Sequence, residues 1–561
     1  MKLINFLLKW ILIFIAGSLI AFGVVRLMSG DPVMMVLSER NLPATEENVN
    51  YLKKEFGLDK PLASQYFEWI VNFTKGEWGK SYMTGIDLKP EILRRAPVSL
   101  MLGLFGLVYA SILAFWLGYM SSLKNGFFDK LTRALTLFTQ TIPVFILIIL
   151  FVYFFGVKYK FIRFFRTGSL ASLLVGIFFV GLPLIGPMSR TVRLYFLEVM
   201  RKPFFRFYVE RGYKKEKALI KYCYHEPLQG LSGLVISQSA YVIGASSVVE
   251  FALSIQGLST FLIESIAHRD YLIIQSYIMM IILWMFFCAL NLHTLLKCRN
   301  KEGECVMKKA IISLAILILM AIVLSMIPTQ NPKLVDIQNK FLPPSAEHIL
   351  GTDHLGRDIF SLMSQGFLRT LSVVVIASAV SYIIGLVLGI VAGFYGGIAL
   401  SVIRFLTDLT LIIPTFIVAL IASIVFTDSV LAVGLALGFS NIGFFANQSY
   451  KLSEIILKDP YVDTLRMLQA PNSYIMRNFL FPELLAPSLN LMGNKASNHI
   501  LAYASLTFIG LGADITAPDF GTMLYQYRGY IIDKPLIVLW PALGIFFLSL
   551  VFHYAFDEVN I

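Results

Sequence analysis

Two polar segments set between long apolar runs decide how this chain folds. The first is Glu198-Val-Met-Arg-Lys-Pro-Phe-Phe-Arg-Phe-Tyr208-Val-Glu-Arg-Gly212, continuing to Pro227, and the second is Glu454-Ile-Ile-Leu-Lys-Asp-Pro-Tyr461-Val-Asp-Thr-Leu-Arg466, continuing to Pro482. Both are predicted to be helical and are too polar to cross a membrane, so each must lie in water between membrane-spanning helices. Because the pattern occurs twice, we expect two related halves.

The composition predicts that lipid covers much of the surface. Hydrophobic residues make up 57% of the 561 residues and charged residues only 15%, whereas soluble domains carry about 25% charged residues. Apolar runs of roughly 20 residues, the length that crosses a bilayer, predict about twelve spans. They lie near residues 5–28, 98–120, 133–155, 169–189, 230–252, 272–294, 309–328, 369–394, 401–426, 429–447, 488–509 and 534–556. We therefore expect an all-α polytopic membrane protein with two parallel six-helix halves.

The basic residues predict the orientation in the membrane. Lys and Arg are concentrated in segments 190–228 and 296–309, which places these segments and both termini in the cytoplasm. Lys158, Lys160, Arg163 and Arg166 fall on the predicted outer side, against this rule. The first apolar run follows Lys2 as a signal peptide would, but it is long and no small-residue cleavage site follows, so we predict a retained span.

Charge and cysteine content exclude other classes of function. The net charge of +12 is accounted for by cytoplasmic loops and anionic lipid headgroups, so no nucleic-acid partner is expected. The four cysteines, Cys223, Cys288, Cys298 and Cys305, have no metal-ligand spacing. Gly79-Lys80-Ser81 imitates the end of a phosphate-binding loop, but Thr74 stands where that motif needs glycine. We expect no metal site, no cofactor and no ATP hydrolysis in this chain.

Three markers recur at matching positions and predict a duplication. Besides the two polar segments, Ile142-Pro143-Val144-Phe145 matches Ile413-Pro414-Thr415-Phe416, and Gln256-Gly257-Leu258-Ser259 matches Ile509-Gly510-Leu511-Gly512. Proline inside a span bends the helix. The predicted halves are 1–298 and 309–561, joined by a cytoplasmic linker at 299–308. Their outer segments lie at about 29–97 and 329–368, and their polar segments at about 198–227 and 454–482.

At these residues the chain resembles the dipeptide/oligopeptide/nickel permease family of ABC importers. The first half resembles the B-type subunit in Arg26-Leu-Met-Ser-Gly-Asp31-Pro32, Phe56-Gly57-Leu58-Asp59, Gln65-Tyr66 and His268-Arg269-Asp270-Tyr271. The second half resembles the C-type subunit in Leu342-Pro-Pro-Ser345, Leu350-Gly-Thr-Asp353, Leu355-Gly-Arg-Asp358 and Ala392-Gly-Phe-Tyr-Gly-Gly397. The resemblance implies a type I importer permease fold, with both subunits fused in one chain.

The resemblance also implies an assembly in the bacterial cytoplasmic membrane. Two ABC ATPase subunits carrying ATP and Mg would bind the polar segments, and an extracytoplasmic solute-binding lipoprotein would deliver peptides or a peptide-sized solute. Nickel or a metal-chelate or opine metallophore is the alternative cargo. A secondary transporter that needs no ATPase is the alternative from a different class.

The resemblance assigns roles to particular residues. The ATPase-coupling residues are Glu198, Tyr208, Arg211, Gly212, Pro227, Tyr461, Asp463, Arg466, Gln469 and Pro482. Residues for binding-protein docking or the outer gate are Asp31, Pro32, Arg269, Asp270, Asp353, Arg357 and Asp358, and Glu250 is a candidate on the solute pathway. Gln469, Gln256 and Tyr503 depart from the family pattern. Because Gln469 stands in place of the glycine kept at Gly212, we expect the second coupling helix to dock with altered geometry, onto a non-identical ATPase.

Overall fold

The computed structural model describes residues 2–28, 31–123, 126–161, 170–295, 335–345, 347–412, 414–426, 429–510, 517–531 and 533–556. Two compact units divide the chain: Trp10–Gln140 with Val144–Cys298, and Arg299–Ile561 with Met1–Lys9 and Thr141–Pro143. We call them the first half and the second half and describe each by itself. The predicted span 309–328 and the linker 299–308 lie outside the described residues.

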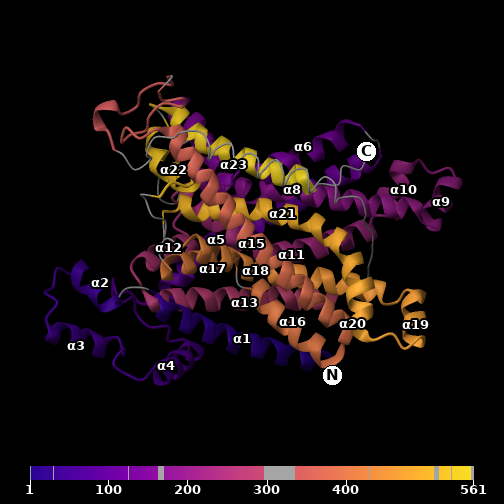
Figure 1. The fold of residues 1–561 in the computed structure, drawn as a ribbon, viewed down its shortest axis with the longest axis horizontal. Helices are drawn as coiled ribbons and strands as arrows, with labels where there is room; N and C mark the ends of the chain where they lie inside the picture. The colour runs from indigo at the N-terminus through magenta and orange to yellow at the C-terminus, as the bar shows by residue number, and fades with distance from the viewer. Residues whose placement is uncertain are drawn as a thin grey trace. The chain divides into compact units, whose positions relative to one another are not determined.

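Apart from turns, loops and an isolated β-bridge, the described residues of the first half are helical (Figure 1). Its helices are α1 (Lys2–Leu27), α2 (Pro32–Glu39), α3 (Glu46–Glu55), α4 (Leu62–Lys75), α5 (Leu88–Leu123), α6 (Phe127–Thr141), α7 (Val144–Phe151), the π-helix η1 (Val152–Lys158), α8 (Leu170–Arg201), α9 (Pro203–Glu210), α10 (Lys215–Tyr222), α11 (His225–Ala252), α12 (Leu258–Ala267) and α13 (Tyr271–Leu295). Helix α5 packs mainly against α8 and α11, and the buried core lies among these three.

From α15 onward the second half repeats the order of elements that begins at α5 in the first half. Its described helices are η2 (Ile337–Asn339), α15 (Ile359–Tyr395), α16 (Gly397–Ile412), α17 (Thr415–Val425), α18 (Val430–Ile456), α19 (Pro460–Met467), α20 (Asn472–Ile475), the π-helix η3 (Met476–Leu480), α21 (Phe481–Phe508), α22 (Phe520–Tyr527), η4 (Arg528–Tyr530) and α23 (Pro535–Phe556). Helix α15 packs mainly against α18, as α5 packs against α8.

Close helix contact is preserved between the halves at matching glycines, of which Gly118 and Gly389 are one pair. A Cβ at Gly118 of α5 would lie 2.8 Å from the carbonyl oxygen of Ser189, and one at Gly389 of α15 would lie 2.6 Å from that of Ala446. Side chains cannot enter such gaps, so glycine allows the two backbones to approach. The long helix pair is therefore the repeated scaffold of each half.

The helices confirm the predicted all-α membrane fold. Six described helices are long and apolar enough to cross a membrane: Trp10–Leu27, Leu88–Leu123, Leu170–Arg201, Ile359–Tyr395, Val430–Ile456 and Pro535–Phe552. Two bent pairs raise the number to eight, with breaks of 94° before Val144 and 75° before Thr415. Both bends fall at the predicted prolines, Pro143 and Pro414, since proline cannot continue the hydrogen-bonded helix.

Three predicted spans are helical but are not among these eight: 272–294 lies in α13, whose apolar stretch Tyr271–Met285 is shorter, and the other two are 230–252 and 488–509. The predicted spans 230–252 and 488–509 correspond to α11 and α21, which occupy the same position in each half. Polar and charged residues interrupt the apolar character of both helices. In a membrane protein, such residues face the interior of the bundle or water rather than lipid.

Candidate coupling helices and outer gate

The first polar segment folds into a short helix closed by a left-handed turn. Pro203 occupies the first turn of α9, where the missing N–H costs nothing. Gly212 has φ +86°, and its N–H donates to the Val209 oxygen at 2.9 Å. A Cβ at Gly212 would meet nothing within 4 Å. The glycine is therefore needed for its backbone conformation and not for space.

Aromatic rings hold α9 against α10. The Tyr208 and Tyr222 rings stack with centroids 4.4 Å apart, and Tyr213 meets Tyr222 edge to face at 5.3 Å. Lys202, just before α9, forms an ion pair with Glu226 in the first turn of α11. The α9–α10 hairpin is thus joined both within itself and to the start of α11.

The second polar segment repeats the turn with a different residue. Gln469 has φ +56°, and its N–H donates to the Arg466 oxygen at 3.0 Å, as Gly212 donates to Val209. The following amide of Ala470 donates to the Leu465 oxygen, as that of Tyr213 donates to Tyr208. Gln469 therefore keeps the conformation of the glycine it replaces, at a cost of about 1–2 kcal/mol for a non-glycine residue.

The same register aligns the remaining residues of the two short helices. Leu465 takes the place of Tyr208, and Tyr461 takes that of Phe204, because both helices are counted from their first-turn prolines. The Tyr461 hydroxyl donates to Glu483 Oε1 at 2.9 Å. Burial and this hydrogen bond raise the pKa of Tyr461, which keeps the hydroxyl protonated as a donor.

Both short helices are thus joined to the next long helix through a glutamate that the sequence analysis missed. Glu226 lies in the first turn of α11 and Glu483 in the first turn of α21. Asp459 stands where the first half has Lys202, and an aspartate cannot pair with Glu483. Tyr461 supplies the donor instead. Only a comparison of the folded halves reveals this exchange.

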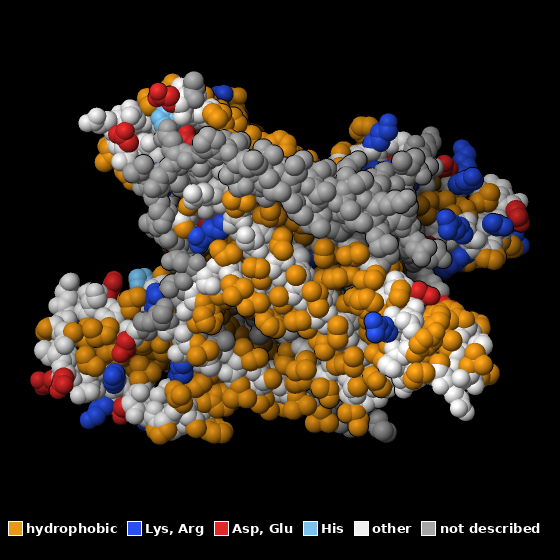
Figure 2. All heavy atoms as spheres, in the orientation of Figure 1, with side chains coloured by type: hydrophobic (Ala, Val, Ile, Leu, Met, Phe, Trp, Pro, Cys, Tyr) orange, Lys and Arg blue, Asp and Glu red, His pale blue; other side chains and the backbone are white. Residues whose placement is uncertain are grey.

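The surfaces of the two short helices differ in chemistry. The α9–α10 hairpin exposes Arg201, Arg206, Arg211, Lys214, Lys215 and Lys217. The end of α19 exposes Met467 and Leu468, with 83% and 73% of each residue accessible, and Asp463 there pairs with Arg466. Figure 2 shows Lys and Arg gathered on the lobe of α9 and α10, and mostly hydrophobic side chains on that of α19. The remaining predicted residues flank these helices: Glu198 and Pro482 are exposed, and Pro227 is buried.

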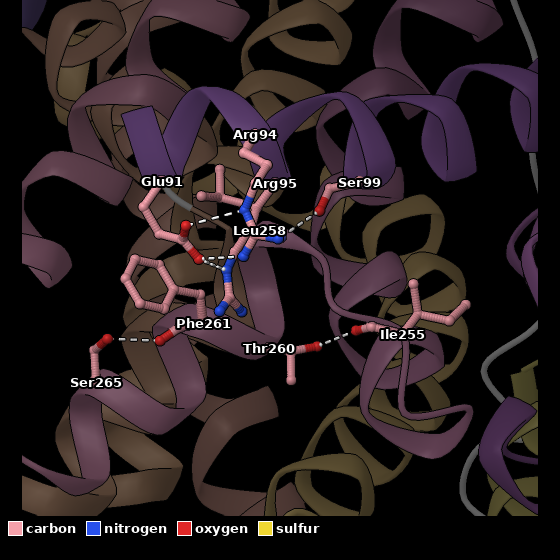
Figure 3. A network of polar contacts seen from close by, with 9 residues as sticks. All are labelled: Glu91, Arg94, Arg95, Ser99, Ile255, Leu258, Thr260, Phe261 and Ser265. Carbon is pink, nitrogen blue, oxygen red and sulfur yellow. Dashed lines mark hydrogen bonds and ion pairs between the residues drawn. The ribbon is translucent and has the colours of Figure 1, made fainter. Parts of the chain in front are cut away.

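At the opposite end of α11, Glu250 caps another helix. Its Oε2 accepts hydrogen bonds from the Ser259 and Thr260 amides at 3.0 and 3.2 Å, in the first turn of α12. Gly257 allows this approach, because a Cβ there would lie 2.3 Å from Glu250 Oε2. The Leu258 amide donates to Ser99 of α5 at 2.8 Å (Figure 3). The fully buried Glu250 thus stabilises a helix N-terminus.

The second half caps the matching helix with a local residue. Tyr503 stands as far before Gly510 as Glu250 stands before Gly257. Asp519 Oδ1 accepts hydrogen bonds from the Gly521 and Thr522 amides at 3.0 and 3.1 Å, in the first turn of α22. Although Tyr503 stands where the first half has Glu250, the matching helix still has a capping carboxylate. It comes from Asp519, at another position in the chain.

Most of the predicted docking residues are buried parts of outer loops. Asp353, which is 0% exposed, accepts from Arg357 Nε at 2.8 Å and from the Tyr527 hydroxyl at 3.1 Å. Asp358 caps α15 through the Ser361 amide at 2.8 Å. This burial argues against direct contact with a partner and indicates that these residues set the shape of the loop.

The outer loop of the first half has a similar turn that is one residue longer. Isolated antiparallel bridges close both loops, Lys80 with Asp87 and Thr352 with Asp358, directly before α5 and α15. The Gly79-Lys80-Ser81 motif belongs to this turn, and Ser81 donates to the buried Asp270 at 2.6 Å. Asp31 is exposed and caps α2, whose first residue Pro32 is buried. Arg269, with φ +54°, is partly exposed.

A family model described as binding-protein-dependent transport system inner membrane component matches residues 110–297 and 385–558. These two matches cover more than half of the chain. The chain belongs to this family. It carries the permease domain twice, which confirms the predicted fusion of two permease subunits.

Individual relatives each resemble less than half of this permease. The probable D,D-dipeptide transport system permease protein of Escherichia coli (strain K12) is 28% identical over 252 residues, 44% of this chain and 83% of the relative. The nickel transport system permease protein of the same organism is 28% identical over 252 residues, which are 45% of this chain and 91% of the relative. The glutathione transport system permease protein of Pectobacterium atrosepticum is 28% identical over 217 residues, which are 39% of this chain and 72% of the relative.

Proposed function

We propose that this permease forms both halves of the pathway of an ATP-driven importer for peptides or a peptide-sized solute. The relatives are permeases named for dipeptide, nickel and glutathione transport, so nickel or a metallophore is the second candidate cargo. One observation carries the proposal. A short helix with a left-handed turn follows a long helix in each half and is joined through a glutamate to the next long helix.

This arrangement suits the transmission of movement. A partner ATPase that binds ATP would displace α9 and α19, and the contacts at Glu226 and Glu483 would pass the displacement to α11 and α21. Glu250 at the far end of α11 caps α12, so the same helix links the cytoplasmic surface to the outer gate. Alternating access by movement of one half against the other follows from such links.

The two coupling surfaces fit different ATPase partners. The basic α9–α10 hairpin suits an acidic groove, whereas Met467 and Leu468 suit an apolar pocket. ATP and Mg would be held by these partners and not by this chain, since Gly79-Lys80-Ser81 forms the turn before α5. An extracytoplasmic binding lipoprotein would deliver solute on the outer side. Both termini would lie in the cytoplasm of a bacterium, in accordance with the positive-inside rule.

Reconstitution tests the proposal. The purified chain alone is expected to hydrolyse no ATP, and proteoliposomes with the ATPases and the binding protein are expected to take up a radiolabelled tripeptide only when ATP is supplied. Lys202→Met removes the ion pair with Glu226, and Tyr461→Phe removes the hydrogen bond to Glu483. Uptake per ATP hydrolysed should fall in both variants. High salt should mimic only Lys202→Met, because an exposed ion pair is screened.

Three results would contradict the proposal. ATP hydrolysis by the isolated chain would place the energy source within it. Uptake driven by an ion gradient without ATP would support a secondary transporter. ATP-dependent uptake of labelled nickel chelate but not of tripeptide would shift the cargo to the second candidate.

A further inference from the structure

The middle of α21 carries basic side chains that the sequence analysis did not single out. Lys495 and His499 lie within the predicted span 488–509, four residues apart and therefore on one face of the helix. Lys495 is the fifteenth of the 28 residues of α21. It lies about 21 Å along the helix from Phe481. A cation at this depth is costly and marks a solute or ion pathway.

The neighbours of Lys495 hold its ammonium group without neutralising it. Its Nζ lies 3.4 Å from Asn441 Oδ1 and 4.0 Å from the centroid of the Phe444 ring, both on α18. Among the ion pairs found in the described residues, none joins Lys495 to a carboxylate within 4.0 Å. The residue is partly exposed. An amide oxygen and an aromatic face orient the charge and leave it available to an anion.

His499 adds unused hydrogen-bonding capacity one turn further along α21. Its Nδ1 lies 3.2 Å from the Ser378 hydroxyl of α15, whereas its buried Nε2 has no partner among the described residues. His499 is 1% exposed. A buried polar atom without a partner requires an explanation, such as a polar group that enters during function.

The same face is open at a polar residue. Asn498, three residues after Lys495, is exposed. An exposed amide near the middle of a membrane helix faces a water-filled space rather than lipid, because lipid leaves its polar atoms unsatisfied. At the position matching Lys495 the first half carries an uncharged residue, Val242, which is 3% exposed. Any electrostatic selection at this depth is therefore built into the second half.

We infer that Lys495, Asn498 and His499 together form an anion-binding site in the solute pathway. This site receives a carboxylate of the transported molecule. The inference rests on the proposed import function and specifies its substrate class: solutes that carry a free carboxylate. An ammonium group and an amide donor together match the oxygens of a carboxylate. Without an ion pair of its own, Lys495 attracts such a group, and the modest number of contacts allows its release.

A labelling experiment tests the site without depending on transport. In the assembled complex, Asn498→Cys is introduced after replacement of Cys223, Cys288, Cys298 and Cys305 by serine. The rates of modification by an anionic and by a cationic methanethiosulfonate reagent are then measured. We expect the ratio of anionic to cationic rates to fall about tenfold when Lys495→Met is added and to be retained with Lys495→Arg. Phe547→Cys, at an exposed apolar position of α23, is the control for lipid-facing sites.

Import provides the second measurement. Proteoliposomes are supplied with a tripeptide as free acid and as C-terminal amide, and the ratio of their uptake rates should fall about tenfold in Lys495→Met and recover in Lys495→Arg. The inference is overturned if neither reagent modifies Asn498→Cys, or if Lys495→Met leaves the reagent ratio unchanged. Equal loss of both tripeptide forms also overturns it, since this would indicate a structural role. Absence of ATP-driven uptake by the unmodified complex would contradict the import function, while the labelling result would still decide the anion site.

Discussion

In the first half of the permease the N-terminus of α12 is capped by Glu250, whereas in the second half that of α22 is capped by Asp519. Glu250 comes from the preceding long helix, and Asp519 directly precedes the helix it caps. Both satisfy amides that would otherwise be buried without partners. What the halves share is therefore a carboxylate at one place in space, and not a carboxylate at one place in the sequence.

The outer loops show the same kind of exchange. In the first half the loop supplies a hydroxyl, Ser81, to the carboxylate of Asp270; in the second the loop supplies the carboxylate, Asp353, to the hydroxyl of Tyr527. The coupling helices show a similar exchange. Lys202 contacts a glutamate at the start of α11, and Tyr461 contacts one at the start of α21. A duplicated fold thus keeps its interactions while the residues that make them diverge.

The largest difference between the halves is expected at the buried loop carboxylates. Asp353→Ala leaves Arg357, 7% exposed, without its buried counter-charge, which should cost about 3–5 kcal/mol. Asp270→Ala leaves the Ser81 hydroxyl and several backbone amides without an acceptor; these groups are neutral, so it should cost about 1–3 kcal/mol. Thermal unfolding of the purified permease, with hydrogen exchange at residues 79–88 and 347–359, measures both. Adding Arg357→Met to Asp353→Ala should restore part of the loss, and equal losses in the two single variants would contradict the comparison.

The helix caps should be exchangeable between the halves. Glu250→Ala should destabilise the first turn of α12 by about 1–3 kcal/mol, because the Ser259 and Thr260 amides lose their acceptor. Glu250→Gln keeps an acceptor and should lose less. Gly257 has φ −95°, which aspartate adopts readily at an N-cap. Adding Gly257→Asp to Glu250→Ala therefore recreates the arrangement of Asp519 and should recover stability, as followed by hydrogen exchange of α12. No recovery would mean that the two caps are not equivalent.

The turns after the coupling helices should respond to exchanged residues in opposite directions. Gly212→Gln introduces left-handed strain, whereas Gln469→Gly removes it. The strain of about 1–2 kcal/mol is partly offset by the greater freedom of glycine in the unfolded chain, about 0.4–1 kcal/mol. We expect a net loss for the first variant and a net gain for the second, each of about 0.5–1 kcal/mol. Proteolysis rates at the two turns measure the change, and shifts of the same sign would show that contacts outweigh the backbone conformation.

The smallest expected effect is a pH response confined to one outer loop. Burial lowers the pKa of His354, so the folded loop favours the neutral ring. The stability that the neutral His354 ring gives to the loop is therefore fully present above the pKa of histidine in the unfolded chain, about 6.5, and is lost as the pH falls below that value. Tyr82, which occupies the matching place in the first loop, has its pKa raised by burial and does not titrate in this range. When the pH is lowered from 7.5 to 5, protection from hydrogen exchange should fall at residues 347–359 but not at 79–88. His354→Tyr should abolish this response. Equal loosening of both loops would refute the assignment to His354.

The helices and bends of this permease follow from local chemistry and can be predicted from the sequence alone. Apolar runs of spanning length, the prolines at 143 and 414, and two polar segments predicted the helices, the bends and the short aqueous helices. Composition also identified the membrane environment. Even the departure at Gln469 could be found by counting residues. Lys495 and His499 carried a signal as well, since ionisable residues within an apolar span indicate function.

Which residues contact one another, and therefore which of them cap, pair or bind, depends on the folded arrangement of the helices. The contacts between Asp353 and Tyr527 and between Ser99 and Leu258 join residues 174 and 159 positions apart. No periodicity reports such pairs, because a hydrogen bond needs only two atoms at the right place and is indifferent to their separation along the chain. Residue type alone would pair Tyr208 with Tyr461. The folded backbone matched Tyr208 with Leu465, since register is fixed by the turn that ends each helix and not by the side chain within it.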